Sequence, residues 1–441
     1  MALAEHAPEK TRRKRVLSGM RPTGRLHIGN YFGALQNWVK LQNDPQNECF
    51  YFIADWHSLT SDYADTSGIA GNTIQVAIDF LAGGLDPQKS VIFLQSQVPE
   101  HAELNLLLSM VTPLGWLERV PTYKEALANV KDKDLHTYGF LGYPVLQAGD
   151  IVMYGEPDKE LIVPVGEDQK SHVELTREIV RKFNFHNGLL LDVAGLSEDR
   201  NYDALRKLEL LLQTRHKASS HISVSVIYPY PGMESNIRAW AAEIGQENFL
   251  KQIEGTPVLG RFVKFDPVLT EPLEQLTETP RIPGTDGRKM SKSYGNTIEL
   301  GESDESIRAK TKVMMTDPAR KKRTDKGNPD VCPVYDWHKL FSPQETLKWA
   351  DQGCRTAGIG CIECKAAMAD NLIRWIGPIR ARRQEYEQHP GRALEILDDG
   401  SKKARRVAQE TMHRVREAVF RWEKKREEVR GSALKRAEAK R

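Results

Sequence analysis

Residues 14–30 read KRVLSGMRPTGRLHIGN, and this stretch decides the fold. Lys14–Gly19 is a short apolar run that ends at glycine, which predicts a first strand. From Ile28 onward the apolar residues follow a helical spacing, at Ile28, Tyr31, Phe32, Leu35 and Val39. The turn between them therefore joins the end of a strand to the start of a helix, where an open parallel α/β sheet binds its ligand.

The rest of the first half repeats the alternation of strand and helix. Cys49–Ala54 and Ser90–Leu94 read as buried strands, and a helix is expected over Thr73–Leu85 between them. A further strand at Leu161–Gly166 leads into a helix over His172–Phe183. This rhythm predicts an α/β, Rossmann-like domain built on a parallel sheet.

The chain divides into five predicted segments: a basic tail (1–15), a Rossmann-like domain (16–188), an inserted subdomain (189–262), a continuation of the Rossmann-like domain (263–305) and a helical C-terminal domain (306–441). Within the insert we expect a charged helix at Tyr202–Leu212, a β-like alternation at His221–Tyr228 and a helix at Asn236–Ile253. The last domain is expected to end in a long amphipathic helix over Val407–Arg441.

The bulk properties are those of a globular protein with two to three domains. The chain has 441 residues, 40% hydrophobic and 28% charged, with a net charge of +3. That charge does not indicate a protein coated in basic surface, although local patches remain able to bind a polyanion. The sequence has no apolar run of about 18 residues and no signal-peptide pattern, so we expect no membrane contact and a cytoplasmic location.

A second string, residues 286–293 (DGRKMSKS), places three cations within five residues. A helix N-terminus together with convergent cations suits a triphosphate. His27 and Asn30 lie three residues apart, so they share a helix face and are both able to donate hydrogen bonds to phosphate. Gly29 leaves room for a base or ribose. Lys289 and Lys292 are flexible charges able to follow a departing pyrophosphate.

Taken together, the two strings resemble the HIGH and KMSKS signatures of class I aminoacyl-tRNA synthetases. The match narrows over residues 26–35 (LHIGNYFGAL), 55–57 (DWH), 142–150 (GYPVLQAGD) and 163–176 (VPVGEDQKSHVELT), which resemble tryptophanyl-tRNA synthetases of the bacterial type. Asn30, in place of the final histidine of HIGH, is typical of that family. The tyrosyl enzymes are its main competitor.

The resemblance implies an enzyme that joins L-tryptophan to tRNA(Trp) through a tryptophanyl-adenylate, with ATP and Mg²⁺ as partners and a homodimer as the assembly. His27, Asn30, Lys289 and Lys292 are its implied catalytic residues. The implied ATP contacts are Arg21, Pro22, Thr23, Gly29, Asn30, Gly166, Glu167, Asp168, Lys289, Met290, Ser291, Lys292 and Ser293. Lys124 matches, more weakly, a mobile lysine that reaches phosphate.

The implied amino-acid pocket contains Asp150, Tyr143, Gln169 and His57. Tryptophan carries a donor-only indole N–H, so a selective pocket needs an acceptor, and in the family that acceptor falls on Asp150. Leaving Asp150 unpaired would penalise analogues that lack the N–H. Tyr143 and Gln169 match positions that hold the ammonium group, and His57 lies near the same pocket. Core packing is the alternative for Tyr143 and His57.

Three alternatives remain open at this point: tyrosine specificity, a synthetase-like regulator that binds tRNA without charging it, and another nucleotidyltransferase with a HIGH-type fold. The intact lysine string argues against the regulator, and the long helical domain after it argues against the third. Two departures from the family pattern, a longer stretch at Tyr154–Val163 and the large insert, do not touch the motif residues.

Four of the five cysteines, Cys332, Cys354, Cys361 and Cys364, have the spacing C-x21-C-x6-C-x2-C. Four thiolates suit zinc and a [4Fe–4S] cluster equally on ligand count. The spacing resembles that of the subset of tryptophanyl-tRNA synthetases with a [4Fe–4S] cluster, which favours iron–sulfur over zinc. Cys49 is expected to be a packing residue. We expect the helical domain to read the anticodon, with the basic run Arg320–Arg323 on the tRNA backbone.

Overall fold

The computed structural model describes residues 13–129, 133–196, 198, 201, 203–204, 206–208, 233–276 and 282–438. Its centre is a parallel five-stranded sheet in the order β3-β2-β1-β4-β7. The strands are β1 (Lys14–Met20), β2 (Asn47–Ile53), β3 (Ser90–Leu94), β4 (Glu160–Val165) and β7 (Pro272–Leu276). The Rossmann-like prediction is confirmed, and the four predicted strands each lie within two residues of the observed bounds.

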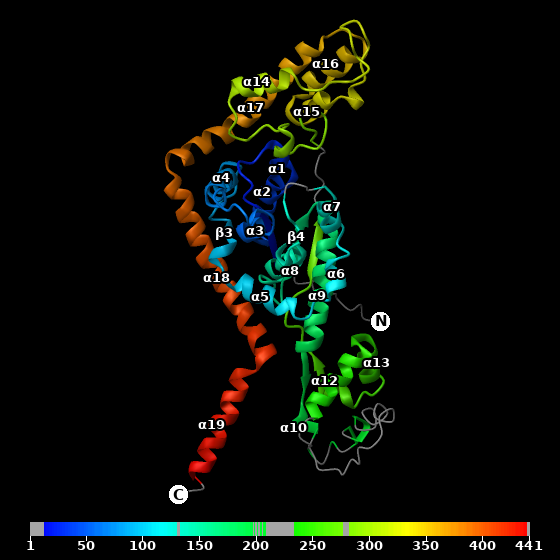
Figure 1. Cartoon of the computed structure of the whole chain (residues 1–441), viewed down its shortest axis with the longest axis vertical. Helices are drawn as coiled ribbons and strands as arrows, with labels where there is room; N and C mark the ends of the chain where they lie inside the picture. Colours follow the sequence, from blue (N-terminus) through cyan, green and yellow to red (C-terminus); the bar gives the residue numbers. More distant parts are fainter. Residues whose placement is uncertain are drawn as a thin grey trace, which may run out of the picture.

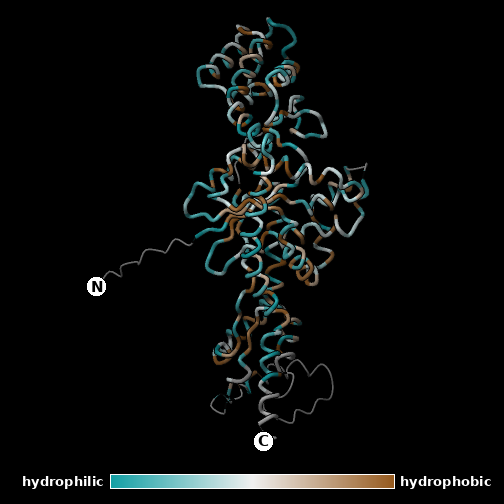
Figure 2. Tube along the Cα trace, turned by 90° about the vertical axis from the view of Figure 1, so that its left-hand side faces the viewer, coloured by the Kyte–Doolittle hydropathy of each residue, from teal (hydrophilic) through white to brown (hydrophobic). Residues whose placement is uncertain are grey.

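Strands β1 to β4 are largely buried on both faces, which is why they read as apolar runs, whereas the edge strand β7 is mostly exposed and does not. Val16 and Tyr51 belong to the core on one side of the sheet, whereas their neighbours Leu17 and Phe50 belong to the core on the other side. Figure 2 shows these hydrophobic strands grouped at the middle of the molecule. Side-chain alternation along each strand thus supplies two hydrophobic cores, and helices cover both.

The helices of this domain follow the strands in sequence. They are α1 (Ile28–Asn30), a π-helical turn (Tyr31–Leu35), α2 (Gln36–Gln42), α3 (Asp55–Asp62), α4 (Ile69–Ala82), α5 (Glu100–Ser109), α6 (Leu114–Leu117), α7 (Pro121–Asn129), α8 (Tyr138–Val152) and α9 (Lys170–Asn187). The expected helix Thr73–Leu85 is α4, shifted toward the N-terminus, and the expected helix His172–Phe183 is α9, longer at both ends.

Beyond α9 the chain builds a small separate core. β5 (Leu189–Leu191) pairs antiparallel with β6 (Val263–Phe265), and α10 (Val193–Leu196), α12 (Met233–Ile244) and α13 (Gln246–Glu254) lie between them in sequence. Figure 1 shows α12 and α13 at the far end of α9, away from the sheet. The side chains of this core include Leu189, Trp240 and Phe249.

The single helix expected over Asn236–Ile253 is wrong, because the chain breaks at Gly245, where φ is +80° and a glycine is favoured. The β-like alternation at His221–Tyr228 lies outside the described residues, as do residues 1–12 of the predicted tail and residues 202, 205 and 209–212 of the predicted charged helix.

After the lysine string the described elements are almost all helical, as predicted. They are α14 (Asp304–Lys312), α15 (Pro333–Phe341), α16 (Gln344–Arg355), α17 (Cys361–Gln388), α18 (Pro390–Phe420) and α19 (Trp422–Glu438). The single terminal helix expected over Val407–Arg441 is wrong: it breaks at Arg421, whose φ is +53°. No described helix has the length and apolar character needed to span a membrane.

α18 returns along the sheet and covers its edge strand, β3 (Figure 1). The hydroxyl oxygen of Ser401 accepts a hydrogen bond of 3.2 Å from the Leu94 amide. At Gly400 a Cβ atom would lie 1.8 Å from the carbonyl oxygen of Ile92, so only glycine permits this approach. The C-terminal helices therefore contact the Rossmann-like domain directly.

Candidate functional site

The first motif leaves β1 and starts α1 through a reciprocal cap. Asn30 N donates 3.2 Å to His27 Nδ1, and His27 N donates 3.1 Å to Asn30 Oδ1. Because Nδ1 accepts a hydrogen bond from the Asn30 backbone N–H, the neutral imidazole carries its proton on Nε2. The cap thus presents two donors, His27 Nε2–H and the Asn30 amide, at a helix N-terminus.

His27 is buried, and its charge state follows from that. Burial, and then the charge of Lys292, lower its pKa to about 4. At neutral pH the side chain is therefore an uncharged hydrogen-bond donor.

The two motifs, far apart in sequence, meet in space. The backbone of Leu26–Ile28 pairs with the segment after the lysine string: Ile28 N donates 2.9 Å to Ile298 O, and Leu300 N donates 2.9 Å to Leu26 O. Buried Met290 reaches over Gly29, where an added Cβ would lie 3.4 Å from its sulfur.

Asn296 organises the loop that carries the lysines. Its side-chain oxygen accepts from Ser291 N at 2.8 Å, and its amide donates to Asp286 Oδ1 at 2.8 Å and to Lys289 O at 3.1 Å. Asn296 is buried, whereas Lys289 and Ser293 are exposed. Asn296 thus holds the loop from its buried side, while Lys289 faces solvent and half-buried Lys292 reaches the first motif. The sequence analysis did not identify Asn296, and its only signal is its place three residues after the KMSKS string.

The remaining predicted ATP residues follow β1 and β4, which are neighbours in the sheet. Gly166 follows β4 in an extended conformation, and a short turn, Glu167–Gln169, comes next with Glu167 exposed. Asp168 lies in that turn, and its side chain is outside the described set. Pro22 is buried beside exposed Arg21 and Thr23. Lys124 lies exposed on α7.

Asp150 is the centre of a buried polar cluster. Its carboxylate, 1% exposed, accepts from His57 Nε2 at 2.7 Å, from His101 Nδ1 at 2.6 Å and from Gln95 Nε2 at 2.8 and 2.9 Å. Burial raises the pKa of Asp150, but the hydrogen bonds from His101 and His57 outweigh it and lower that pKa to about 2. The group is therefore a carboxylate.

Two of these partners, Gln95 and His101, were not predicted from the sequence. Gln95 directly follows β3 and His57 lies just after β2, so both stand at carboxyl ends of adjacent strands. That position is the signal that would have found Gln95. His101, in the first turn of α5, carries no comparable signal; its Nε2 contacts the Tyr154 hydroxyl at 2.8 Å.

Tyr143 belongs to a second polar cluster on the same helix, α8. Its hydroxyl lies 2.5 Å from Thr122 Oγ1 and 3.1 Å from His172 Nε2, and His172 Nδ1 lies 2.8 Å from Gln147 Oε1. Burial raises the pKa of Tyr143, and the hydrogen bond from Thr122 and the charge of Arg21 oppose that rise. Arg21 thus places the first motif within electrostatic reach of this cluster.

The four C-terminal cysteines come from three helix ends. Cys332 precedes α15, Cys354 lies in the last turn of α16, and Cys361 and Cys364 lie in the first turn of α17. Burial and then the three other cysteines raise the pKa of Cys364 to about 12, so the four thiols share one neighbourhood. Among the residues that the structure describes, no group of three or more His, Cys, Asp and Glu side chains is spaced to hold a metal ion.

Within the basic run Arg320–Arg323, whose contact with tRNA stays a prediction, Arg320 does not lie on the surface. Its side chain turns inward, donating 2.5 Å to Ile359 O and 3.1 Å to Arg323 O, with Nη1 3.7 Å from Cys354 Sγ. It is 8% exposed, whereas Lys321 and Lys322 are exposed. Arg320 therefore supports the cysteine neighbourhood.

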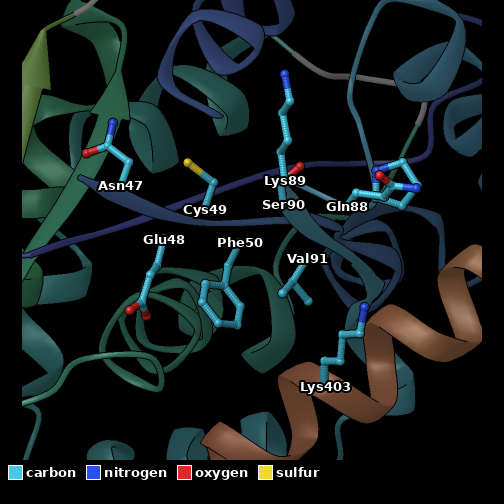
Figure 3. A pocket seen from close by; sticks show the side chains of 10 residues that line it. Asn47, Glu48, Cys49, Phe50, Gln88, Lys89, Ser90, Val91 and Lys403 are labelled. Atoms are coloured by element: carbon cyan, nitrogen blue, oxygen red, sulfur yellow. The ribbon is translucent and has the colours of Figure 1, made fainter. Parts of the chain in front are cut away.

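A pocket of about 250 Å³ lies at the opposite edge of the sheet (Figure 3). It is lined by the amino ends of β2 and β3, including Glu48 and Ser90, and by Lys403 of α18. Ligands of open parallel sheets bind at the carboxyl ends. None of the predicted site residues lines this pocket, so it is separate from the candidate site.

Comparisons with known proteins agree with this geometry. The family model described as tRNA synthetases class I (W and Y) matches residues 9–198 and 256–376. The chain is 46% identical to a tryptophan–tRNA ligase of Ralstonia nicotianae and 43% identical to that of Thermotoga maritima, over 92% of this chain and 98% of each relative. A solved tryptophanyl-tRNA synthetase of Campylobacter jejuni, complexed with ADP and tryptophan, is 30% identical with a TM-score of 0.66, covering 92% of this chain and 99% of that chain.

A parallel sheet whose carboxyl edge carries the HIGN cap against the KMSKS loop, with these matches, defines the class: the chain belongs to the class I aminoacyl-tRNA synthetases of the W and Y family. Within that family its relatives place it among the tryptophan–tRNA ligases.

Proposed function

We propose that the chain charges tRNA(Trp) with L-tryptophan in two steps at the carboxyl edge of its sheet. The tryptophan carboxylate attacks the α-phosphorus of ATP, a new P–O bond forms and pyrophosphate leaves. The terminal ribose hydroxyl of tRNA then attacks the adenylate carbonyl, and AMP leaves. The observation that carries the proposal is the direct contact of the two motifs through Lys292 and Thr23.

His27 and Asn30 act on the phosphates as neutral donors. The cap uses only His27 Nδ1 and Asn30 Oδ1, so it does not occupy the His27 Nε2–H or the Asn30 side-chain N–H groups. Both donors are therefore able to stabilise the negative charge that develops as pyrophosphate departs. Lys289 and Lys292 supply the positive charge from the other side. ATP enters as its Mg²⁺ complex, and the Gly166–Asp168 turn lies beside the ribose.

Asp150 selects tryptophan by accepting the indole N–H. Its two oxygens already accept four contacts, which fills the roughly four acceptor sites of a carboxylate. The Gln95 amide spans both oxygens, so it is the partner that gives up one of them when the indole arrives. Tyr143 and Gln169 are proposed to hold the ammonium group, and His57 fixes the second oxygen of Asp150.

The four cysteines are proposed to hold a [4Fe–4S] cluster, with zinc as the alternative. Thiolates at helix N-termini, as at Cys332, Cys361 and Cys364, are favoured by the helix dipole. The proposal is supported by the spacing of the four cysteines and by their placement at the ends of α15, α16 and α17. Such a cluster would pin three helix ends together.

We also propose the five-segment division of the chain given above, with residues 189–262 as an insert and residues 306–441 as the anticodon-binding domain. The family match resumes at 256 after ending at 198, which supports the insert. Lys321 and Lys322 remain candidates for the tRNA backbone. A homodimer in the cytoplasm, where translation uses charged tRNA, belongs to the same proposal.

Amino-acid-dependent ATP–pyrophosphate exchange tests the function. The purified chain should exchange label with tryptophan and not with tyrosine, and should then charge tRNA(Trp). Exchange with tyrosine alone would make it a tyrosyl enzyme. Binding of tRNA without exchange or charging would make it a regulator.

A further inference from the structure

A buried ion pair joins the C-terminal helix α17 to the Rossmann-like domain. The guanidinium of Arg383 contacts the carboxylate of Asp79 on α4, and the two side chains are 1% and 0% exposed. They lie 304 residues apart in sequence. A charge in the apolar helix α4 is costly to bury unless it is paired and hydrogen-bonded.

The second oxygen of Asp79 reaches the first motif. Oδ2 accepts a hydrogen bond of 2.6 Å from the backbone N–H of Leu26, the residue before His27. The Leu26 carbonyl accepts from Leu300 N at 2.9 Å, on the strand-like segment that follows the lysine loop. The backbone of Leu26 is therefore held on one side by Asp79 and on the other by the second motif.

Arg383 also contacts other residues that hold the two motifs in place. It shares the acceptors Gln75 and Glu387 with Arg25, which lies inside the first motif. A Cβ at Gly301 would lie 2.7 Å from Arg383 Nε, so the guanidinium packs directly beneath the segment that follows the lysine loop. Arg383, which lies on the C-terminal helix α17, thus contacts residues next to both motifs.

We infer that Asp79 is a positioning residue for the ATP site, held by Arg383 so that its carboxylate fixes the Leu26–His27 backbone. This inference rests on the proposed role of His27 in handling ATP. Burial raises the pKa of Asp79 to about 6, and Arg383 and the Leu26 amide oppose that rise. Asp79 also lies within electrostatic reach of Lys292, which ties the same carboxylate to the second motif.

The test compares ATP use with tryptophan binding in the full chain. The variants are Asp79→Asn, Arg383→Met, Arg383→Lys and the apolar double variant Asp79→Leu/Arg383→Met. ATP–pyrophosphate exchange gives kcat and the KM for ATP, and fluorescence titration gives the Kd for tryptophan, whose pocket at Asp150 is separate. The exposed pair Arg392–Glu385 provides the control, Arg392→Gln, with an ion pair of 3.0 Å near the same helix end.

We expect Asp79→Asn and Arg383→Met to lower kcat/KM for ATP by about tenfold or more while tryptophan Kd stays within about twofold. Arg383→Lys should recover most of the loss, because it keeps the charge beside Asp79. If the single variants do not fold, the double variant removes both charges together, which a core tolerates better, and should show the same selective loss.

Wild-type ATP kinetics in a folded variant that lacks Asp79 would overturn the inference. Equal loss of tryptophan binding and ATP use would also overturn it, because that indicates a general scaffold role. Failure of the proposed function would appear in the wild-type chain itself, as absence of tryptophan-dependent exchange, and is thus distinguishable from failure of the variants alone.

Discussion

The ammonium group of Lys292 donates a hydrogen bond of 2.9 Å to the backbone oxygen of Thr23, 269 residues earlier in the chain. At Gly24, the next residue, φ is +100° and a Cβ would lie 3.4 Å from the same nitrogen. A flexible lysine thus lies against a turn that permits close approach of the backbone. Burial lowers the pKa of Lys292, and the charges of Glu299 and Asp79 oppose that fall.

Lys292→Ala should therefore reduce kcat in ATP–pyrophosphate exchange by about 10²-fold, the usual effect of losing one group that stabilises transition-state charge. The tryptophan Kd should change little, because Lys292 is not in the Asp150 cluster. Lys402→Ala, which removes an exposed lysine on α18, is the control and should retain wild-type kcat. A Lys292→Ala enzyme with full kcat would remove this lysine from the mechanism.

Asn296→Ala should loosen the lysine loop. The change leaves the Ser291 N–H and the Lys289 carbonyl, both partly buried, without their partner, at a cost of about 0.5–1.5 kcal/mol for each lost hydrogen bond. We expect a several-fold higher KM for ATP and faster proteolysis within 286–295. Asn248→Ala, on the exposed face of α13, is the matched amide control. Unchanged protease sensitivity would mean that the loop does not depend on Asn296.

Stability should depend on pH through His27. Its pKa is about 4 when folded and 6.5 in the reference state, so below pH 6.5 the unfolded chain binds a proton that the folded chain does not. Folding stability is therefore full above about pH 6.5 and falls as pH drops toward 4, by up to about 3 kcal/mol.

Urea unfolding at pH 7, 6 and 5 measures this effect. His27→Gln should show a smaller loss of stability between pH 7 and 5 than wild type, whereas replacement of exposed His136 should leave the loss unchanged. An identical pH dependence in His27→Gln and wild type would contradict the buried neutral state.

Asp150→Asn should weaken tryptophan use. The amide nitrogen of the new asparagine would face at least one of the N–H groups that now donate to the carboxylate, so that hydrogen bond would be lost. A charge-assisted hydrogen bond is worth about 1.5–3 kcal/mol. We expect the KM for tryptophan to rise about 10- to 100-fold, with the KM for ATP nearly unchanged. Asp65→Asn, on an exposed turn, serves as control. Normal tryptophan KM in Asp150→Asn would assign the carboxylate a purely structural role.

Iron and acid-labile sulfide should co-purify with the chain under anaerobic conditions, at about four of each per chain for a [4Fe–4S] cluster. Cys361→Ser should lose both, while Cys49→Ser, in β2 and outside the cysteine neighbourhood, should keep them. One zinc per chain and no sulfide would replace the iron–sulfur proposal with the zinc alternative.

The sequence predicted β1 to β4 well because each is a short, largely buried apolar run, but it did not predict β7, whose residues are mostly exposed. It predicted helix ends less well. Gly245 and Arg421 break helices that the spacing of apolar residues made continuous, because the pattern of hydrophobic residues carries across a one-residue break. The sequence also predicted that Arg320 lies on the surface, although it is buried. A run of basic residues has the same sequence pattern whether or not its first side chain is buried after folding.

By itself the sequence determined the α/β class, the two motifs and the identities of the groups on them, because these depend on local spacing and residue type. Only the tertiary structure decided which groups support them: Gln95 and His101 on Asp150, Asn296 under the lysine loop, and Arg383 on Asp79 behind Leu26. The partners of Asp150 and Asp79 lie 49 to 304 residues away, whereas Asn296 lies within 10 residues of the loop atoms it binds. A buried charge or amide is specified by what it touches after folding, and no local pattern records that contact.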